Sequence, residues 1–191
     1  MKRVWLFVLG LACGTLGMAA PRIAVHMRRV FHGQRSGPTG SEQRVHTEEK
    51  FAFTAKGRME VVAPLFGAEK ERVWSPGWNP RFIHPLPAAD EQGMVFTVAH
   101  DQLTAAWVNT EFDLKSGSIQ YVYVIPDALV TVITLRLLPQ GDQTRVEVGY
   151  DRTALRAKAD AHVRHMAEGD RRAGPEWEQQ VNDYLQNVGS H

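Results

Sequence analysis

Two side chains in this 191-residue sequence, Glu111 and His84, have the chemistry of a general acid or base. A carboxyl that faces an apolar interior has a raised pKa, which suits proton transfer near neutral pH. Successive side chains of a strand point to opposite faces, so the face of segment 104–113 decides where Glu111 lies. If Trp107 points inward, Asn109 and Glu111 point inward with it. The opposite register leaves a dry interior, and binary patterning favours that register.

Aromatic side chains spread over several predicted elements are the main indication of a binding function. Small-molecule pockets are mostly apolar, with a few polar groups that orient the ligand. Dense core packing is the competing interpretation, because buried aromatic residues are common in any core. His84 ends the predicted strand 81–84 close to Trp78, where a ligand contact competes with a structural role. The residues predicted to contact a ligand are Trp78, His84, Phe96, Trp107, Tyr121, Tyr123, Ile133, Leu135, Tyr150 and Trp177.

Other kinds of catalytic chemistry find little support in the sequence. It contains no Gly-x-Ser-x-Gly, His-Glu-x-x-His, Gly-x-Gly-x-x-Gly or P-loop motif. His162 and His165 are three residues apart on a predicted helix, but Arg164 lies between them and transition-metal sites usually need three or more ligands. We therefore predict neither a metal site nor a cofactor. Any catalysis would be acid–base chemistry by Glu111, His84 or a tyrosine.

The charge distribution divides the chain near Arg44 and excludes one class of partner. The 22 Lys and Arg residues nearly balance the 21 Asp and Glu residues, for a net charge of +1. Residues 1–44 hold 7 of the basic and 1 of the acidic residues, whereas the remainder holds 15 basic and 20 acidic residues. An acidic body is unsuited to nucleic acid, because phosphate binding needs several Lys or Arg side chains on one face.

The first 44 residues have the composition of a targeting segment followed by a linker. Residues 1–20 combine two basic residues, an apolar run and small residues near the end, which predicts a secretory signal peptide or, if uncleaved, an N-terminal membrane anchor. Cys13, the only cysteine, is a candidate for lipidation. Residues 21–44 are typical of a basic flexible linker. We expect an exported (periplasmic or extracellular) or membrane-anchored protein, with membrane contact through residues 4–29.

From residue 45 the predicted order is a strand, two short helices, a run of strands and a long C-terminal helix. Alternating patterns predict strands at 46–55, 81–84, 93–99, 104–113, 118–125, 129–138 and 144–153. The breaks between the later strands are short, which permits only antiparallel connections. Pro64 limits a short helix over 57–66, and a second one covers 69–74.

Helical spacing returns near the C-terminus. Met166 and Trp177 are 11 residues apart, which is about three turns, so both lie on one apolar stripe. Gly174-Pro175-Glu176 has the composition of a helix start, with proline at the first position and an acidic residue in the first turn. We therefore predict a kink or a restart of the helix at this point.

Segments 69–80 (EKERVWSPGWNP), 93–97, 121–126, 144–146 and 153–155, together with Trp107, resemble the SRPBCC superfamily of START-like, pollen-allergen-like and polyketide-cyclase-like proteins. The resemblance implies an α+β helix-grip fold over residues 45–191, in which a curved antiparallel sheet, two short helices and a long C-terminal helix surround an apolar cavity. Members of this superfamily bind lipids, sterols, hormones or polyketides, and only some are enzymes, so the fold does not fix the function.

Three hypotheses follow for the function. The first is non-covalent binding of a small hydrophobic ligand, such as a lipid or polyketide, by an exported or membrane-tethered domain. The alternative is a cyclase- or lyase-like enzyme that acts on a polyketide-type substrate in the same cavity. A further alternative is a protein-interaction module that exposes Trp74 and Trp78 on its surface.

Overall fold

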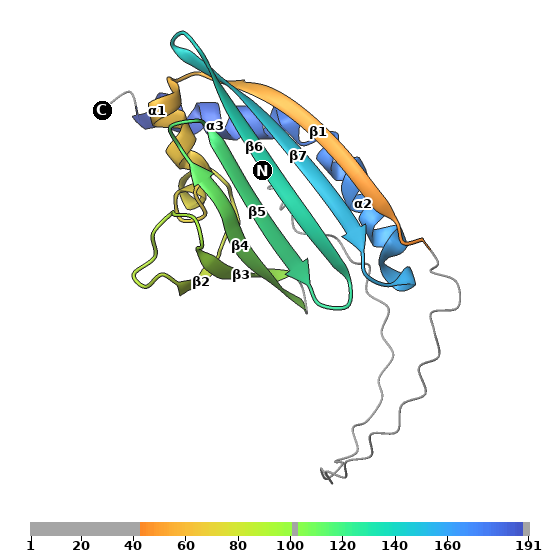
Figure 1. Cartoon of the computed structure of the whole chain (residues 1–191). Coiled ribbons are helices and arrows are strands. Elements are labelled where there is room, and N and C mark those ends of the chain that lie inside the picture. The colour runs from red at the N-terminus through yellow and green to blue at the C-terminus, as the bar shows by residue number, and fades with distance from the viewer. Residues whose placement is uncertain (1–42, 101–102, 189–191) are drawn as a thin grey trace, which may run out of the picture. The chain divides into compact units, whose positions relative to one another are not determined.

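Seven antiparallel strands form one curved sheet in the computed structural model, which describes residues 43–100 and 103–188 (Figure 1). The strand order is β1-β7-β6-β5-β4-β3-β2, so consecutive strands are neighbours from β2 to β7 and β1 pairs with β7. The strands are β1 (His46–Ala55), β2 (Arg81–His84), β3 (Val95–His100), β4 (Leu103–Asp113), β5 (Ser118–Ile125), β6 (Leu129–Gln140) and β7 (Gln143–Ala154).

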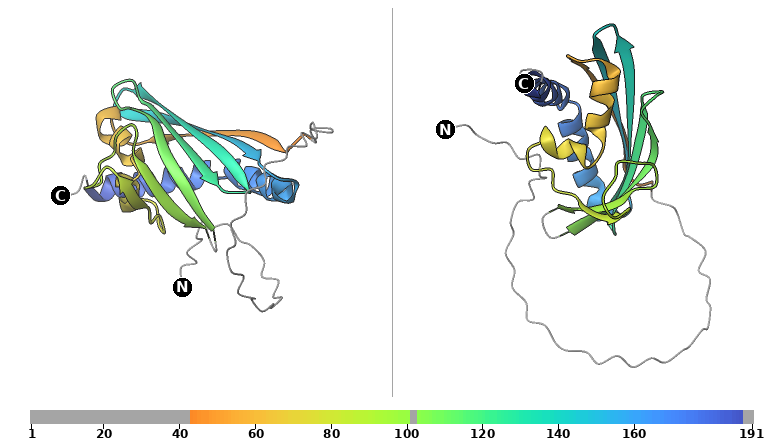
Figure 2. Two further views of the ribbon diagram at one scale, coloured as in Figure 1. Left: turned by 60° about the horizontal axis from the view of Figure 1, so that its bottom comes forward. Right: turned by 90° about the vertical axis from the view of Figure 1, so that its left-hand side faces the viewer.

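The helices lie on one face of this sheet, as the edge-on view in Figure 2 shows. Between β1 and β2 the chain forms α1 (Met59–Val62), η1 (Ala63–Phe66) and η2 (Lys70–Val73). After β7 it forms η3 (Ala157–Ala159), α2 (Asp160–Asp170) and α3 (Gly174–Val188). None of the helices within the described ranges combines the length and the hydropathy needed to cross a bilayer.

Local sequence explains the strands and their turns. In β6 the buried Leu129, Ile133 and Leu135 alternate with side chains that face outward, of which Arg136 is exposed. The β4–β5 turn depends on Gly117, which has a φ of +72° and lies so close to β6 that an added Cβ would be 2.3 Å from a backbone carbonyl oxygen. The antiparallel hairpins that the short breaks predict are confirmed.

The predicted restart of the C-terminal helix is also confirmed, because α2 ends at Asp170 and α3 begins at Gly174. Gly174 lies against the ring of Phe51, where an added Cβ would be 3.3 Å from the nearest ring atom. Farther along α3, the buried Asn182 accepts a hydrogen bond from the Lys56 N–H at 2.7 Å and donates one to the Thr54 carbonyl at 3.0 Å. These contacts hold α3 across β1 and complete the helix-grip architecture.

The described structure does not test the predictions for the N-terminal segments. Residues 1–20 and nearly all of residues 21–44 lie outside the described residues, so the signal peptide, the anchor and the linker stay predictions. The folded part begins near residue 45, where Val45 donates its N–H to Asp160 at 3.2 Å and its carbonyl accepts from Ala154 at 2.9 Å.

Candidate functional site

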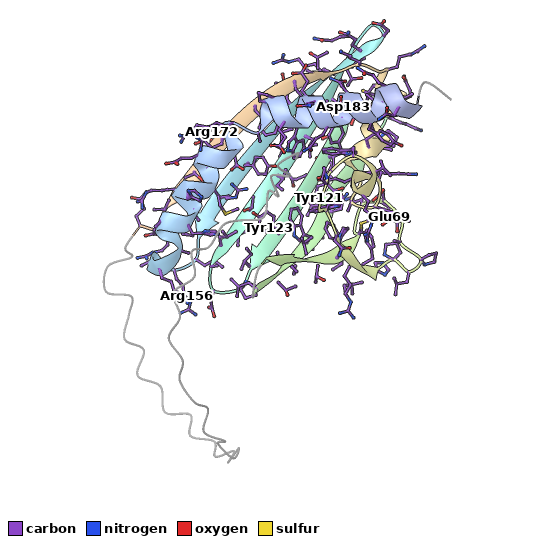
Figure 3. The ribbon with its side chains drawn as sticks, turned by 180° about the vertical axis from the view of Figure 1, so that it is seen from behind. Glu69, Tyr121, Tyr123, Arg156, Arg172 and Asp183 are labelled. Carbon is purple, nitrogen blue, oxygen red and sulfur yellow. The ribbon has the colours of Figure 1, made fainter. Side chains whose placement is uncertain are left out.

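Five aromatic side chains, from β3, β4, β5 and the loop before β2, pack together on the inner face of the sheet. We call them the strand cluster: Trp78, Phe96, Trp107, Tyr121 and Tyr123. The ring centroid of Trp107 lies 5.6 Å from that of Trp78, 5.5 Å from that of Phe96 and 4.3 Å from that of Tyr123. Figure 3 shows Tyr121 and Tyr123 on the face of β5 that the helices cover. The structure therefore brings together five residues that the sequence predicts at the site.

A second group of rings lies under α3. The helix cluster consists of Phe51, Phe53, Phe66, Trp74, Tyr150 and Trp177. Trp177 holds it together, because its ring centroid lies 5.5 Å from that of Phe51 and 5.4 Å from that of Trp74. Tyr150 joins the cluster through Phe51, at 6.3 Å. The two remaining predicted apolar contacts, Ile133 and Leu135, are buried on the inner face of β6.

Among the described residues, three buried side-chain atoms lack a hydrogen-bond partner, and all three belong to neighbouring inward positions of β4. They are Trp107 Nε1 and both polar atoms of the Asn109 amide. Asn109 is 0% exposed and Trp107 is 8% exposed, so bulk water does not reach either group. By contrast, the indole N–H groups of Trp74 and Trp78 each donate to a backbone carbonyl at 2.7 Å. An unpaired buried polar group costs about 1–3 kcal/mol, which marks this position as a polar subsite.

Tyr121 connects the polar subsite to the short helices. Its hydroxyl donates a hydrogen bond to the Phe66 carbonyl at 3.0 Å. Burial raises the pKa of Tyr121, and the charges of Glu71 and Asp90 raise it further. The Asn109 amide lies beside the hydroxyl and lowers its pKa, although the amide atoms do not reach hydrogen-bond geometry. Tyr121 is therefore a neutral hydrogen-bonding group near neutral pH.

Glu71, on η2, is the titratable group with the clearest functional potential. Burial, and then the charge of Asp90, raise the pKa of Glu71 to about 8. Its own charge acts on the hydroxyls of Tyr121 and Tyr150, one from each aromatic cluster. The carboxyl therefore keeps its proton at neutral pH, even though the residue as a whole retains some contact with solvent.

Asp90 fixes the segment that carries Glu71. Its two carboxylate oxygens accept hydrogen bonds from the N–H groups of Glu69, at 2.8 Å, and Lys70, at 3.2 Å. Gly67 lies against the same carboxylate, where an added Cβ would be 2.3 Å away. Burial raises the pKa of Asp90, while the two backbone hydrogen bonds lower it. The second acid therefore has a structural role.

A buried cation, Arg152 of β7, occupies a different part of the inner face. Its Nε donates to Thr131 at 3.2 Å and to the Tyr123 hydroxyl at 3.4 Å, and its Nη1 pairs with Asp170 of α2. The guanidinium carbon lies 4.8 Å from the centroid of the Tyr150 ring. Burial lowers the pKa of Arg152, but Tyr123 and Asp170 outweigh that effect and raise it. Arg152 thus joins α2 to the sheet as one half of an ion pair.

The expectation that Glu111 follows Trp107 and Asn109 inward is wrong, and so is the dry alternative. Trp107 and Asn109 do point inward, but β4 has a bulge between Asn109 and Glu111. Asn109 pairs with Tyr121, whereas Glu111 pairs with Gln120, which alternates with the buried residues of β5 and faces outward. The extra residue in the bulge moves Glu111 to the outer face. Glu111 is therefore not an acid or base of this site.

His84 and the exposed-tryptophan hypothesis are corrected as well. His84 is exposed at the end of β2, where a change of register follows the half-buried Phe82. Phe82, not His84, reaches the strand cluster, with its ring centroid 5.8 Å from that of Phe96. Trp74 is 5% exposed and Trp78 is half-buried, so these two side chains do not form a surface patch for a protein partner.

Sequence reasoning missed Glu71 and Arg152, yet each had a signal. Arg152 follows Val148 and Tyr150 at a spacing of two, which places its side chain on the buried face of a strand. Glu71 and Trp74 are three residues apart on a short helix, so they share one side of it. In both cases the apolar pattern predicts a buried position. A charged residue is not normally expected at such a position, so it was not included among the candidates.

One group of residues in the described part of the chain has the composition of a metal site. His46, Glu48 and Asp151 lie on exposed positions of β1 and β7, with their ligand atoms within 4.8 Å of one another. The two carboxylates face different ring nitrogens, since Glu48 lies 3.5 Å from Nε2 and Asp151 lies 3.6 Å from Nδ1. This arrangement is a polar contact between strands on the surface, outside the inner face.

Comparisons of sequence and structure give different results for this chain. No family model and no curated protein matches the sequence. Solved structures do match. Norcoclaurine synthase from Thalictrum flavum, in complex with dopamine and hydroxybenzaldehyde, is 11% identical, with a TM-score of 0.55 over 83% of this chain and 98% of that one. The Zhui aromatase/cyclase from Streptomyces sp. R1128 is 12% identical, with a TM-score of 0.59 over 75% and 96%. The XoxI protein from Bacillus cereus is 15% identical, with a TM-score of 0.53 over 76% and 99%.

These neighbours are Bet v1 and SRPBCC-type helix-grip proteins. The chain therefore has the helix-grip fold, with a curved antiparallel sheet and a C-terminal helix across its inner face. The sequence identities are low, so the likeness establishes the fold alone, and the function has to be argued from the site.

Proposed function

We propose that this domain binds a small, mainly apolar molecule against the strand cluster, without covalent chemistry. The observation that carries the proposal is the pair of unpartnered groups on β4, Trp107 Nε1 and the Asn109 amide. An indole N–H only donates, so it needs an acceptor, and an amide both donates and accepts. A ligand with an apolar body and a carbonyl or hydroxyl group would satisfy both. The surrounding rings would supply apolar contact, worth roughly 25 cal/mol per Å² of buried area.

The proposal is tested with prodan, a neutral naphthyl ketone whose emission shifts with the polarity of its surroundings. Titration of the purified protein is expected to give saturable binding with one site per chain and a blue-shifted emission. Trp107→Phe keeps an aromatic ring but removes the N–H donor, so it is expected to weaken prodan binding about 5- to 10-fold, in line with a hydrogen bond of about 1 kcal/mol. Trp74→Phe is the matched control, since that indole already has a partner within the protein.

Two results would contradict this proposal. One is the absence of saturable binding of any apolar ligand, combined with no co-purifying small molecule in a native mass spectrum. The other is equal loss of prodan affinity in Trp107→Phe and Trp74→Phe, because a general loosening of the aromatic packing would then explain both.

A second candidate function is acid–base catalysis on a bound carbonyl compound, as in a cyclase or lyase. The observation that favours it is Glu71, whose pKa of about 8 leaves a proton to donate at neutral pH. Glu71 takes the place of Glu111 and His84 as the candidate group. Exchange of the hydrogens next to the prodan carbonyl for deuterium, followed by NMR, tests it: the protein should speed up exchange and Glu71→Gln should not.

Export or membrane tethering belongs to the same proposal. Its support is the sequence of residues 1–29, where basic residues flank an apolar run. Cell fractionation of the full chain, with mass measurement of the recovered protein, is expected to find it outside the cytoplasm or in the membrane fraction. Recovery of the full-length chain from the soluble cytoplasmic fraction alone would contradict the proposal.

A further inference from the structure

The outer face of the sheet, which faces the viewer in Figure 1, is not covered by any helix of the described residues. An antiparallel sheet with one face in water usually places apolar residues inward and polar residues outward. The hairpin of β5 and β6 departs from this pattern near its turn, where the outward positions hold valine, and polar outward residues return only at Gln120 and Thr134. Six outward valines of β3 to β6 form what we call the outer patch: Val95, Val108, Val122, Val124, Val130 and Val132.

The register of the sheet joins these valines into one surface. A row of valines crosses four strands, because Val95 pairs with Val108, Val108 with Val122 and Val122 with Val132. Val124 and Val130 pair with each other next to this row. Paired side chains on adjacent strands have Cβ atoms about 5 Å apart, which is close enough to touch. Val108, near the centre, is 38% exposed. A contiguous apolar surface of this kind is typical of an interaction site, whereas single exposed apolar residues are not.

Charged residues border the outer patch on two sides. On one side Val132 pairs with the exposed Asp151 of β7. On the other side the exposed Arg81 of β2 pairs with Thr97, which is the next outward position along β3 from Val95. Arg81 forms no ion pair with any other residue that the structure describes. The outer patch is thus an uncharged strip between an acidic residue and a basic one.

A second copy of the chain matches this arrangement. In the order β7-β6-β5-β4-β3-β2 the midline of the patch runs between β4 and β5, with β2 and β7 equally many strands away from it. A two-fold axis parallel to the strands, placed above this midline, lays two sheets face to face and brings β2 of each copy over β7 of the other. Valine rows then pack on valine rows, and Arg81 lies near Asp151 of the partner subunit. Stacked sheets lie about 10 Å apart, so side chains from the two faces reach one another.

The size of the outer face is sufficient for such a contact. Six strands about 4.8 Å apart are roughly 29 Å wide, and the 8 residues of β5 are about 27 Å long. Their product, about 780 Å², is an upper limit, since the curved sheet bends away from a partner at its edges, and a standard interface buries about 800 Å² on each partner. A contact of this size is expected to give a reversible dimer rather than a permanent one.

We propose that the outer patch is the interface of a homodimer, in which two sheets pack face to face about a two-fold axis that runs along the strands. The valines supply the apolar centre of the interface, and Arg81 and Asp151 form an ion pair between subunits at each of its two borders. This inference goes beyond the proposed binding function, because the strand cluster lies on the opposite face of the sheet and stays accessible in the dimer.

The test is sedimentation velocity of the full chain at concentrations from about 1 to about 100 µM. The parent is expected to change from monomer to dimer within this range. Val108→Lys places an unpaired charge at the centre of the interface twice per dimer, so it is expected to raise the Kd of the dimer at least about 100-fold. Ala52→Lys is the matched control, because it adds the same charge at an exposed outward position of β1, outside the contact. It should change the Kd less than about twofold.

Charge reversal tests the position of the axis. Arg81→Glu and Asp151→Arg each place like charges opposite one another and are expected to raise the Kd about fivefold or more. The double variant restores opposite charges across the interface and is expected to recover the affinity of the parent. Near-UV circular dichroism of each variant shows that it is folded.

Four results would overturn the proposal. A parent chain that stays monomeric over the whole range has no such dimer. A dimer that persists unchanged in folded Val108→Lys forms through another surface. A dimer that Val108→Lys abolishes, but whose affinity the double charge reversal does not recover, has a different axis. A monomer that binds phosphatidylcholine vesicles, with loss of binding in Val108→Lys, uses the outer patch against lipid instead of a second copy.

Discussion

Replacing Glu71 with Gln is expected to stabilise the folded domain increasingly as the pH rises from 5 to 8. The buried position of the Glu71 carboxyl destabilises the folded domain only when the carboxyl is charged. Below pH 4.5 the carboxyl is protonated in both the folded and the unfolded chain. Between pH 4.5 and about 8 the unfolded chain has lost the proton that the folded domain retains, so the free energy of unfolding falls with pH. Above about pH 8 the folded domain is ionised too, and this decline ends.

The size of the effect follows from the two pKa values. One pKa unit corresponds to about 1.4 kcal/mol. A pKa that rises from 4.5 to about 8 therefore sets an upper limit of about 5 kcal/mol for the free energy of unfolding lost by pH 8. Glu71 retains some contact with solvent, which weakens the effect of burial. We expect roughly half of that limit, about 2–3 kcal/mol, as the difference in pH dependence between the parent and Glu71→Gln.

The assay is urea unfolding of the ligand-free full chain at half-unit steps from pH 5 to 9, followed by tryptophan fluorescence. The quantity to compare is the change in the free energy of unfolding with pH in the parent, in Glu71→Gln and in the control Glu69→Gln. The parent and the control should decline together while Glu71→Gln stays flatter. Parallel curves for the parent and Glu71→Gln, separated by a constant offset, would refute the reasoning, because the carboxyl would then not carry a raised pKa in the folded state.

Three further substitutions test the packing around the site. Arg152→Ala leaves Asp170 buried without its partner and is expected to cost about 3–5 kcal/mol in chemical unfolding, whereas the double change Arg152→Met with Asp170→Leu should recover most of that loss; a single variant within 1 kcal/mol of the parent, by the same assay, would contradict the buried pair. Gly117→Ala should lower the unfolding temperature well below that of Gly141→Ala, because both positions have positive φ but only Gly117 meets a backbone oxygen; equal shifts would contradict this. Trp107→Phe removes an unpartnered N–H, whereas Trp74→Phe removes the same ring volume together with a hydrogen bond to the Leu65 carbonyl, so Trp107→Phe is expected to cost less stability in urea unfolding than Trp74→Phe; an equal or larger loss in Trp107→Phe would contradict the unpartnered N–H.

Much of the fold was predictable because its determinants are local. The predicted strands 46–55, 81–84 and 118–125 coincide with β1, β2 and β5. Alternation of side chains sets where a strand runs, and short breaks with turn residues force antiparallel neighbours. Proline at the second position of α3 marked the restart of the C-terminal helix. These features depend on a few consecutive residues, and the sequence displays them directly.

The aromatic residues of the site were predictable as a set, but the inward position of Trp107 and the polar groups beside it were not, because binary patterning favours the opposite register of this strand. Strict alternation carries Trp107, Asn109 and Glu111 to the same face. One bulge in β4 ends that alternation, which leaves Asn109 inside and moves Glu111 outside. A bulge depends on how a strand pairs with its neighbour. The sheet face on which Glu111 lies is therefore set by β5 as well as by its own strand.

The sequence by itself determined the order of elements and the antiparallel sheet, since periodicity and turn chemistry act over short distances. Only the tertiary structure decided which acidic residue has a strongly raised pKa. Glu71 gains its raised pKa from burial and from Asp90, which is 19 residues away in the chain and is brought next to it by the loop after β2. The pKa of a side chain depends on the charges and the solvent around it, and that environment exists only when distant segments have packed together.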